Sequence, residues 1–400
     1  MPMEIQQPPS RRPVVLVFAP HYWPAFRAGG AVRTLRNMAA QLGDAIDFRF
    51  FTRDRDVGDT SPYAGMVPGQ WGDVDGARVM YAGNRQRSLA AVARMIREVD
   101  PDVIYLNSFF DAKFSLLPLV ARRFGMTGRR VPWIIAPRGE FSKGALALKA
   151  WKKKPCIACC RAVGLHAGVI WQASSDLERQ DIHRVMGTGA RIRVAADLTE
   201  QVGPLPGVPP ERAGPMRVCF LSRLSPKKNL LYAIDVVRRV RQPIRFDILG
   251  PLEDPAYWET CQRAIAQTPA GCTIEWKGEV PHEDVRKTLA GYDLMLFPTL
   301  GENFGHVIFE ALAAGVPVLV SDQTPWQDLD ARGSGWVRPL ETPQAFVDVL
   351  ESAAASDPAA RRAAAVAAHA HALEVSRSAA VLGANRGLFL DAATDPPPAG

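Results

Sequence analysis

The sequence lacks the long apolar stretches of membrane-spanning and secreted proteins. No run reaches the ~18 apolar residues that a membrane-spanning helix needs. The segment MPMEIQQPPSRRP has no apolar core after its arginines and does not resemble a secretory signal. The six cysteines among 400 residues follow no regular spacing, as is typical of proteins in a reducing compartment. These absences favour a cytoplasmic protein.

Signatures of several ligand-binding classes are also missing. The first β-rich run is followed by FAPHYWPAFRAGGAVR rather than by G-x-G-x-x-G, and no acidic residue is placed to bind a ribose, which argues against an NAD enzyme. In the segments expected to line a cleft, no H-x-E, D-x-D or Cys/His cluster has metal-ligand spacing, so we expect no metal ion. No nucleic-acid-binding fold or aromatic–basic platform is recognised, so we expect no nucleic-acid partner.

Charge is unevenly distributed between the two halves of the chain. Residues 1–200 contain 29 Lys and Arg against 18 Asp and Glu, a net charge of +11, whereas the remaining 19 against 23 give −4. The basic half favours an anionic partner such as a phosphate or a lipid headgroup, and ordinary solubility charge is the alternative explanation.

The apolar residues alternate between short β-rich runs and helical patterns. Helical spacing extends over Gly30–Leu42 and Leu89–Val99. Buried strands are expected in both halves, at Val14–Phe18, Asp47–Phe51, Asp102–Leu106, Pro132–Ala136, Arg217–Leu221, Arg245–Leu249, Cys272–Trp276, Leu294–Pro298 and Val316–Val320. Strands that alternate with helices predict parallel sheets covered by helices on both faces.

A segment rich in Pro and Gly separates the two series of strands. QVGPLPGVPPERAGP, Gln201–Pro215, contains five prolines and three glycines and is the expected interdomain linker. The sequence therefore predicts an α/β fold with two Rossmann-like, doubly wound domains facing each other across a cleft, since open α/β sheets bind ligands at the carboxyl ends of their strands. The expected parts are residues 1–200, the linker 201–215, residues 216–375, a helix at 376–392 that returns to the first domain, and a disordered tail at 393–400.

The clearest candidate site is GENFGHVIFEALAAGVPVLVSD, Gly301–Asp322. A strand leads into a loop that carries Glu302, and a helix begins near Gly305 with its first amide groups available to an anion. Glu310 lies eight residues after Glu302, a rise of roughly 12 Å in a helix. This exceeds the ~5–9.5 Å between paired glycosidase carboxylates, so we interpret the two glutamates as contacts to different parts of one extended ligand.

In each half of the chain, the loop that follows the first strand is a further candidate site. In the second half the loop carries Arg223, Lys227 and Lys228 just before a helix, and such cations bind phosphate or diphosphate. In the first half Gly29 and Gly30 precede a helix and let the backbone approach a ligand closely.

Together these motifs resemble the retaining GT-B glycosyltransferases of family 4. The resemblance rests on Arg223…Lys228, on the Glu302-x7-Glu310 motif within GENFG…EALAAGVPV, and on Gly29-Gly30. It is strongest over Arg217–Pro339. In the front half, PRGEFSKGALALKAWKKKP resembles the branch that builds bacterial exopolysaccharide, capsule or O-antigen units on lipid carriers.

The resemblance implies a role for each motif. Arg223 and Lys228 would neutralise the diphosphate of a nucleotide-sugar donor with a UDP or GDP group. Glu302 would lie near the transferred sugar, and Glu310 would bind the ribose. The other implied donor contacts are Asn303, Phe304 and Gly305 at the sugar or phosphate, Gly278, Glu279 and Val280 in WKGEVPHEDV at the base, and Gly29 and Gly30 at the phosphates.

The resemblance also implies a reaction that needs no cofactor, protein nucleophile or metal. As the nucleoside diphosphate leaves, fixed cations and helix-end amides stabilise its growing negative charge more strongly in the transition state than in the ground state. The departing phosphate oxygen is expected to take the proton of the acceptor, which is a lipid-linked or other oligosaccharide.

Two positions depart from the family pattern. Many relatives carry a His after the fourth strand of the first domain, where this chain has Asn107 or Ser108, and Asp197 stands in place of the usual Asn-Gly turn. The residues expected on the acceptor side, with an ordinary surface loop as the alternative, are Asn107, Arg138, Glu140 and Lys143.

The segment GALALKAWKKK combines Leu146, Leu148 and Trp151 with four lysines. Basic amphipathic segments with Trp often lie on membrane surfaces, and each Lys near an anionic leaflet contributes about 1 kcal/mol. We expect this helix to dock on the anionic inner face of the plasma membrane, and a solvated helix packed by its leucines is the alternative. The neighbouring CIACC, Cys156–Cys160, is expected to supply small buried side chains.

Three alternative functions remain open. A sugar-nucleotide epimerase of the same fold needs cleft acids that the sequence does not place. A catalytically silent GT-B subunit is consistent with the Asn107 departure. A nucleic-acid-binding protein fits the basic half but leaves Arg223, Lys228, Glu302 and Glu310 unexplained.

Overall fold

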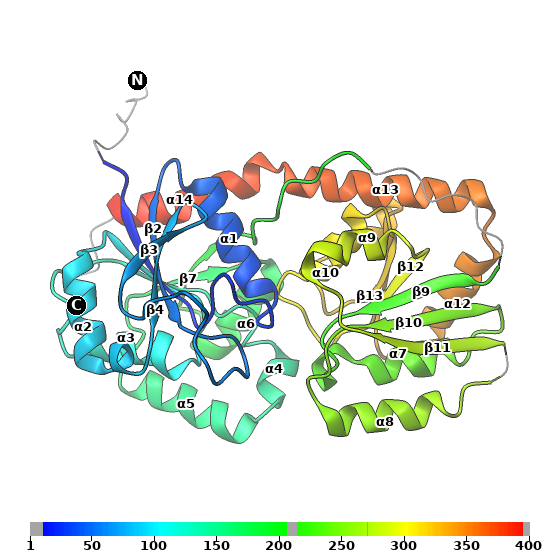
Figure 1. Ribbon diagram of the computed structural model, residues 1–400, viewed down its shortest axis with the longest axis horizontal. Helices are drawn as coiled ribbons and strands as arrows, with labels where there is room; N and C mark the ends of the chain where they lie inside the picture. The colour runs from blue at the N-terminus through cyan, green and yellow to red at the C-terminus, as the bar shows by residue number, and fades with distance from the viewer. Residues whose placement is uncertain (1–10, 206–213, 270, 395–400) are drawn as a thin grey trace. The chain divides into compact units, whose positions relative to one another are not determined.

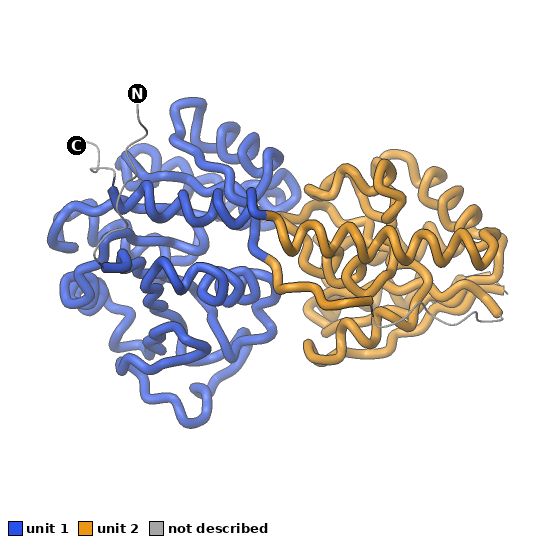
Figure 2. The backbone as a smooth tube through the Cα atoms, turned by 90° about the horizontal axis from the view of Figure 1, so that it is seen from above, with its two compact units in different colours: residues 1–198, 379–400 blue, residues 199–378 orange. Residues whose placement is uncertain are grey.

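The computed structural model describes residues 11–205, 214–269 and 271–394. They form two compact units, unit 1 with residues 1–198 and 379–400 and unit 2 with residues 199–378, which Figure 2 shows in separate colours. The sequence places these boundaries at residues 200 and 376. Of the expected linker and tail, residues 206–213 and 395–400 lie outside the described residues, and the rest of the linker is neither helix nor strand.

Unit 1 is an α/β unit built on one sheet. Its described elements are β1 (Val14–Phe18), α1 (Gly30–Leu42), β2 (Asp47–Arg53), β3 (Trp71–Val74), β4 (Ala77–Ala82), η1 (Arg85–Arg87), α2 (Leu89–Val99), β5 (Val103–Leu106), η2 (Ala112–Leu116), α3 (Leu117–Arg123), β6 (Trp133–Ile135), α4 (Lys143–Ala147), α5 (Ala150–Ala162), β7 (Ile170–Ala173), α6 (Asp176–Met186), β8 (Arg191–Val194) and α14 (Ala379–Thr394). The strand order is β3-β4-β2-β1-β5-β6-β7-β8, and within the described residues β3 pairs antiparallel with β4 while the other pairs are parallel.

Helices cover both faces of this sheet (Figure 1). On one face α1 and α14 pack on alternate residues of β1 and β2, and Phe389 of α14 contacts the ring of Tyr105 at 5.5 Å between centroids. On the other face lie α2, α3, α5 and α6, over Leu16 and Phe18 of β1. Because both faces are covered, every residue of β1 is apolar and buried, as expected for a central parallel strand.

Unit 2 repeats this design with a smaller sheet. Its described elements are β9 (Met216–Leu221), η3 (Pro226–Lys228), α7 (Leu230–Val237), β10 (Ile244–Leu249), α8 (Pro255–Ile265), β11 (Cys272–Gly278), η4 (His282–Asp284), α9 (Val285–Leu289), β12 (Leu294–Phe297), α10 (His306–Ala313), β13 (Val318–Ser321), α11 (Leu329–Arg332), β14 (Gly335–Arg338), α12 (Pro343–Ala355) and α13 (Pro358–Ser376). The strands follow the order β11-β10-β9-β12-β13-β14, parallel in every described pair. Helices α7, α8 and α12 lie on one face, and α9, α10 and α13 on the other (Figure 1).

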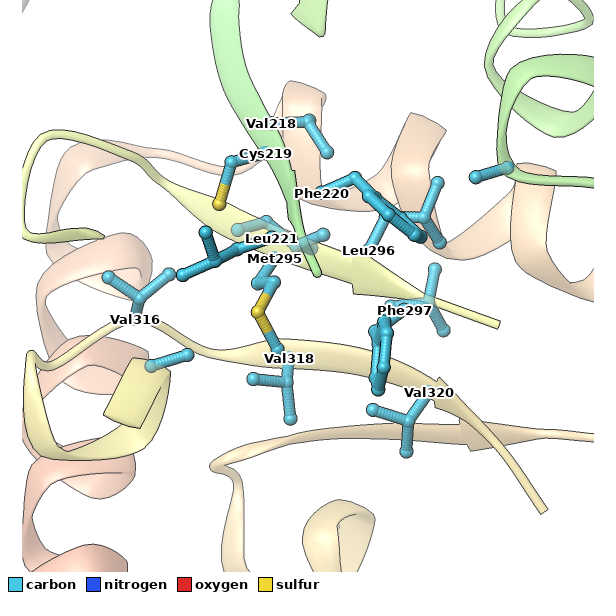
Figure 3. Packing of buried hydrophobic residues seen from close by; sticks show 14 of the residues in the cluster. Val218, Cys219, Phe220, Leu221, Met295, Leu296, Phe297, Val316, Val318 and Val320 are labelled. Carbon is cyan, nitrogen blue, oxygen red and sulfur yellow. The ribbon is translucent and has the colours of Figure 1, made fainter. Parts of the chain in front are cut away.

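The core of unit 2 sits where β9, β12 and β13 lie side by side. Val218, Phe220, Leu296, Phe297 and other residues of these strands fill it (Figure 3). The crossover between β9 and β12 places the loops after these two neighbouring strands at the same edge of the sheet. This edge carries the residues of the candidate site.

Each strand expected from the sequence is present within two residues of its predicted ends, and the helices at Gly30–Leu42 and Leu89–Val99 have the predicted ends. The sequence analysis missed β3, β4, β7, β8 and β14. The turn between β3 and β4 is Asp75-Gly76, with positive φ at both residues, and an Asp-Gly pair between β-rich segments is a strong hairpin signal that was overlooked.

Two smaller expectations were only partly right. The helix expected at 376–392 is α14, which runs on to Thr394, so the first two residues of the expected tail are helical. In CIACC, Cys160 is buried but Cys159 is exposed. No described helix is both long and apolar enough to cross a membrane.

Candidate functional site

The main cluster of unit 2 joins Lys228 and Glu302. Lys228 ends the short η3 helix after β9, and Glu302 lies in the loop after β12, the neighbouring strand. Lys228 Nζ donates to Glu302 Oε1 at 2.7 Å, and the two side chains are 13% and 11% exposed. The fold thus brings together two residues that the sequence assigned to one ligand from segments 74 residues apart.

Neighbouring groups hold the Glu302 carboxylate in place. The Thr299 hydroxyl donates to Glu302 Oε1 at 2.9 Å, and the Glu302 amide donates to the Gln323 carbonyl at 3.0 Å. Burial raises the pKa of Glu302, but the charges of Lys228 and Lys227 and the hydrogen bonds from Lys228 and Thr299 outweigh it and bring this pKa below its usual value. Glu302 is therefore an anion, rigidly oriented at the sheet edge.

The loop after Glu302 turns into α10 at Gly305. Gly305 has φ 85° and ψ 61°, and a Cβ there would lie 2.9 Å from the Ile308 side chain, so the helix start requires glycine. Phe304 is buried, and its carbonyl accepts a 2.6 Å hydrogen bond from Trp326 Nε1. The side chain of Phe304 therefore packs in the core, so a donor contact at this residue would use its backbone.

The other glutamate, Glu310, lies within α10 and is buried. His282 Nδ1 is 3.9 Å from Glu310 Oε1, and His282 belongs to the segment Trp276–Val285 that was expected to hold the donor base. The structure thus places the expected ribose contact beside the expected base segment.

A cavity of about 680 Å³ opens beside the same segment. Gly278 ends β11 with φ 85°, and Glu279 and Val280 follow it on the cavity wall. The floor includes Asp247, which is buried and accepts a 3.1 Å hydrogen bond from the Tyr292 hydroxyl. The size lies within the ~300–1,000 Å³ range of small-molecule sites.

Arg223 is placed differently from Lys228. Its guanidinium pairs with Glu253 at 2.8 Å, and the two side chains are 42% and 44% exposed. Arg223 was expected to act with Lys228 beside the glutamates, but in this structure its ion pair is made with a surface carboxylate instead. An exposed pair of this kind contributes little to stability, so Glu253 is easily exchanged for another anion.

In unit 1, Gly29 and Gly30 lie at the start of α1. Gly29 is the N-cap, with φ 73°, and Gly30 is the first helical residue. A Cβ on Gly29 would meet no atom within 4 Å, so the backbone angle rather than crowding requires glycine there. Close approach of a ligand at Gly29 and Gly30 stays a prediction.

Arg138 is the centre of a buried polar network in unit 1. Its Nε donates to Asn107 Oδ1 at 2.8 Å, Nη2 donates to the Tyr105 hydroxyl at 2.5 Å, and Nη1 pairs with Asp197. Burial lowers the pKa of Arg138, but Asp197 and Tyr105 outweigh it and raise the pKa above its usual value. The family departures Asn107 and Asp197 are thus both partners of one buried guanidinium.

Glu140 also binds protein groups. Its carboxylate accepts hydrogen bonds from the amides of Phe109 and Phe110, at 2.6 and 3.2 Å, and from the Ser108 hydroxyl at 2.8 Å. Lys143, the first residue of α4, is exposed. Of the four residues expected on the acceptor side, Asn107, Arg138 and Glu140 therefore hold loops in place, and Lys143 is the one that faces solvent.

No group of three His, Cys, Asp or Glu side chains in the described part of the chain is arranged to hold a metal ion. A D-x-D string does follow β2, at Asp54 and Asp56. Asp54 pairs with Arg55 at 2.9 Å, and Asp56 accepts hydrogen bonds from the amides of Phe26 and Arg27. Both carboxylates are thus engaged by neighbouring residues.

Sequence reasoning missed Thr299 and His282 as parts of the site. Thr299 is the second residue after β12, so its place between a strand end and Glu302 was a usable signal. His282 lies within the predicted base segment, but the sequence did not indicate that its ring is 3.9 Å from Glu310.

Two family models together match most of the chain. "Glycosyl transferase 4-like domain" matches residues 29–196, and "Glycosyl transferases group 1" matches residues 206–369. The two matches follow the division into units and include both the Gly29-Gly30 turn and the Lys228–Glu302 cluster.

Curated relatives and a solved structure are similar to this chain. O-antigen chain mannosyltransferase B of Escherichia coli is 30% identical over 111 residues, 26% of this chain and 28% of the relative. The putative teichuronic acid biosynthesis glycosyltransferase TuaC of Bacillus subtilis is 23% identical over 280 residues, 65% of this chain and 62% of the relative. In both comparisons the chain spans less than two thirds of the relative's length.

The fold is that of GT-B glycosyltransferases. HepE of Anabaena, solved in complex with UDP and glucose, superimposes with a TM-score of 0.68 at 17% identity, covering 96% of this chain and 100% of HepE. At this identity the likeness concerns the fold, which is two Rossmann-like α/β domains as expected from the sequence.

Proposed function

The chain belongs to the group 1 glycosyltransferases, and we propose that it transfers a hexose from a nucleotide-diphosphate sugar to a saccharide acceptor, with retention of configuration, in the assembly of a bacterial polysaccharide. Support comes from the names of the relatives, which concern O-antigen and teichuronic acid, and from HepE, which was solved with UDP and glucose. The observation that carries the proposal is the buried Lys228–Glu302 pair beside the start of α10.

The reaction needs stabilisation of a departing diphosphate. The bond between the sugar's anomeric carbon and the phosphate oxygen breaks, and its electron pair stays on that oxygen. The acceptor hydroxyl oxygen bonds to the anomeric carbon, and its proton passes to the departing phosphate oxygen. Lys228 would neutralise the growing charge, and Arg223 would join it by exchanging Glu253 for the diphosphate.

Glu302 has two effects in this scheme. Without ligand it satisfies the charge of Lys228, so no buried cation is left unpaired. With donor bound, its anionic oxygens would face the positive charge that develops on the sugar ring in an oxocarbenium-like state. In this scheme Lys228 would face the negative charge of the leaving diphosphate, and Glu302 would face the positive charge of the sugar ring.

Donor recognition would use Glu310 of α10 and the segment at the end of β11. Glu310 would accept hydrogen bonds from the ribose hydroxyls, and the backbone at Gly278–Val280 would bind the base beside the 680 Å³ cavity. Thermal-shift measurements with UDP, GDP and their hexose conjugates would identify the base. If neither nucleotide raises the melting temperature, the proposed donor class is wrong.

The acceptor is proposed to be lipid-linked, with unit 1 on an anionic membrane surface. Trp151 at the start of α5 is 74% exposed, next to Lys152, and Lys149 and Lys154 are also exposed. Lys153 is different, because its Nζ donates to the Ala145 carbonyl at 2.6 Å and lies over the Phe110 ring. A docking test should therefore neutralise Lys149, Lys152 and Lys154 and leave Lys153 unchanged.

The central experiment is product analysis with and without an acceptor. The chain should convert donor and acceptor to a glycoside whose anomeric configuration, measured by the proton coupling constant, matches that of the donor. An inverted product would exclude the retaining mechanism. A donor that changes its sugar without any acceptor would indicate an epimerase instead.

A further inference from the structure

The loop after β13, residues 322–328, supports the loop after β12 that carries Glu302 and Phe304. Because β12 and β13 are parallel neighbours, both loops lie at the same edge of the sheet. The Gln323 carbonyl accepts a 3.0 Å hydrogen bond from the Glu302 amide, and Trp326 Nε1 donates to the Phe304 carbonyl at 2.6 Å. The first bond joins two backbone groups, whereas the second depends on the side chain of Trp326.

The Trp326 side chain is buried and packed between aromatic rings. Its ring centroid lies 5.4 Å from that of Phe304 and 5.5 Å from that of His371 in α13. The His371 ring is in turn hydrogen-bonded to the buried Ser334 hydroxyl at 2.9 Å. These contacts hold the indole in one orientation, with its N–H group directed at the Phe304 carbonyl.

The bond from Trp326 also orients the amide group that follows the Phe304 carbonyl. This carbonyl and the Gly305 N–H belong to one trans peptide unit, in which they point in opposite directions. Since the carbonyl faces the buried indole, the Gly305 N–H faces away from it. A Cβ on Gly305 would lie 3.5 Å from Trp326 Nε1, so the indole lies directly against this residue. In the described part of the chain, the Gly305 N–H has no hydrogen-bond acceptor.

We propose that Trp326 is a positioning residue for sugar transfer, because its indole N–H fixes the peptide between Phe304 and Gly305 and so presents the Gly305 amide to the donor. The inference rests on the proposed function, in which the donor contacts the backbone of this loop. A donor group that is already oriented needs no reorganisation when charge develops in the transition state. Without the indole N–H, the Phe304 carbonyl would be a buried acceptor without a partner, and the peptide would rotate to regain one.

The first test measures amide hydrogen exchange in the full chain without donor. Trp326→Phe keeps an aromatic ring in the core and removes the N–H donor. The hydrogen-bonded amides of Glu302, Ile308 and Phe309 should then exchange about tenfold faster, while those of β9 exchange as in the wild type. Trp336→Phe, which changes another Trp packed on the core of unit 2, is the matched control and should leave all these rates unchanged.

A second variant separates the hydrogen bond from the packing. In Trp326→His the imidazole Nε2–H occupies the same place in a five-membered ring as the indole Nε1–H, but the second ring of the indole is lost. If the hydrogen bond positions the loop, Trp326→His should resemble the wild type more closely than Trp326→Phe does. If only packing matters, the order is reversed and the proposal is overturned.

The kinetic test applies the same variants to the transfer reaction. The kcat of Trp326→Phe at saturating donor should fall at least about tenfold, Trp326→His should retain more of the rate, and Trp336→Phe should equal the wild type. Wild-type exchange or a wild-type kcat in Trp326→Phe would overturn the proposal. If Trp326→Phe does not fold, near-wild-type exchange and kcat in Trp326→His support the proposal, and loss of both overturns it. The exchange measurement needs no donor, so its failure is distinguishable from a failure of the wild type to transfer sugar.

Discussion

The ammonium group of Lys228 and the carboxylate of Glu302 neutralise each other at 2.7 Å, almost completely covered by protein. A buried pair of this kind behaves as a unit, because removal of one partner leaves an uncompensated charge. The leaving-group role of Lys228 and its structural role can therefore be separated only by comparing variants with and without the glutamate charge.

Lys228→Ala should slow transfer by about 10²–10³-fold at saturating donor, as expected when one preorganised group at a developing charge is lost. Lys228→Ala/Glu302→Gln should recover melting temperature lost by the single variant but not the rate. Arg239→Ala, which removes an exposed cation on the same unit, is the control. Wild-type turnover by Lys228→Ala would exclude a role at the leaving group.

Glu310→Gln should weaken nucleotide binding by about 10- to 150-fold, since one charge-assisted hydrogen bond to the ribose is worth about 1.5–3 kcal/mol. Isothermal titration with UDP and GDP measures this directly. The rate at saturating donor should change much less than the affinity. Equal affinity of the variant and the wild type for both nucleotides would remove Glu310 from the ribose site.

Gly250→Ala should destabilise unit 2 severely. Gly250 has φ 131°, and a Cβ there would lie 1.9 Å from the Ser222 carbonyl oxygen, so the loops after β9 and β10 would have to separate. Gly189→Ala in unit 1, where a Cβ meets no atom within 4 Å and φ is unexceptional, is the control. Thermal unfolding should show a large fall in melting temperature for Gly250→Ala and almost none for Gly189→Ala.

Stability should fall as the pH drops below about 6.5, because burial lowers the pKa of His371 in the folded protein. The unfolded chain then binds a proton before the folded one does. The stabilisation is therefore full above the unfolded pKa of about 6.5 and is lost as the pH falls. The pKa values of His21 and His166 are also lowered, and burial is the largest cause of both shifts.

His371→Gln should flatten the pH dependence of the melting temperature between pH 5 and pH 7.5. The His371 ring accepts or donates one 2.9 Å hydrogen bond with Ser334, which a Gln amide can replace. His183→Gln is the control, because His183 is only half-buried, near the end of α6. A slope identical to that of the wild type would assign the pH dependence to other groups.

Nine of the fourteen described strands could be predicted because each contains a short apolar or β-rich run. VVLVF is buried throughout, so composition alone identified β1. By contrast β8 and β14 are half-exposed edge strands with Arg and Gly among few residues, and no periodicity marks them in the sequence. Their positions are determined by pairing with β7 and β13, which is information of the tertiary structure.

The site was predictable at the level of motifs but not of contacts. The sequence indicated that Lys228 and Glu302 serve one ligand, but their direct pairing depends on β9 lying next to β12. It could not show that Arg223 pairs with Glu253, a residue in another loop. Nor could the sequence show that the side chains of Arg138 and Glu140 bind protein groups. Both residues follow the end of a strand, which is also where ligand-binding residues lie in such folds.

The C-terminal helix has a consequence for the order of folding. Leu388 and Phe389 of α14 belong to the core that β1 and β2 begin, so the first unit is made of two pieces of chain separated by the whole of the second. On the ribosome, unit 2 is therefore complete before unit 1, although unit 1 begins first. A chain that stops after Ser378 would expose to water the part of the unit 1 core that α14 covers, and aggregation would then compete with folding.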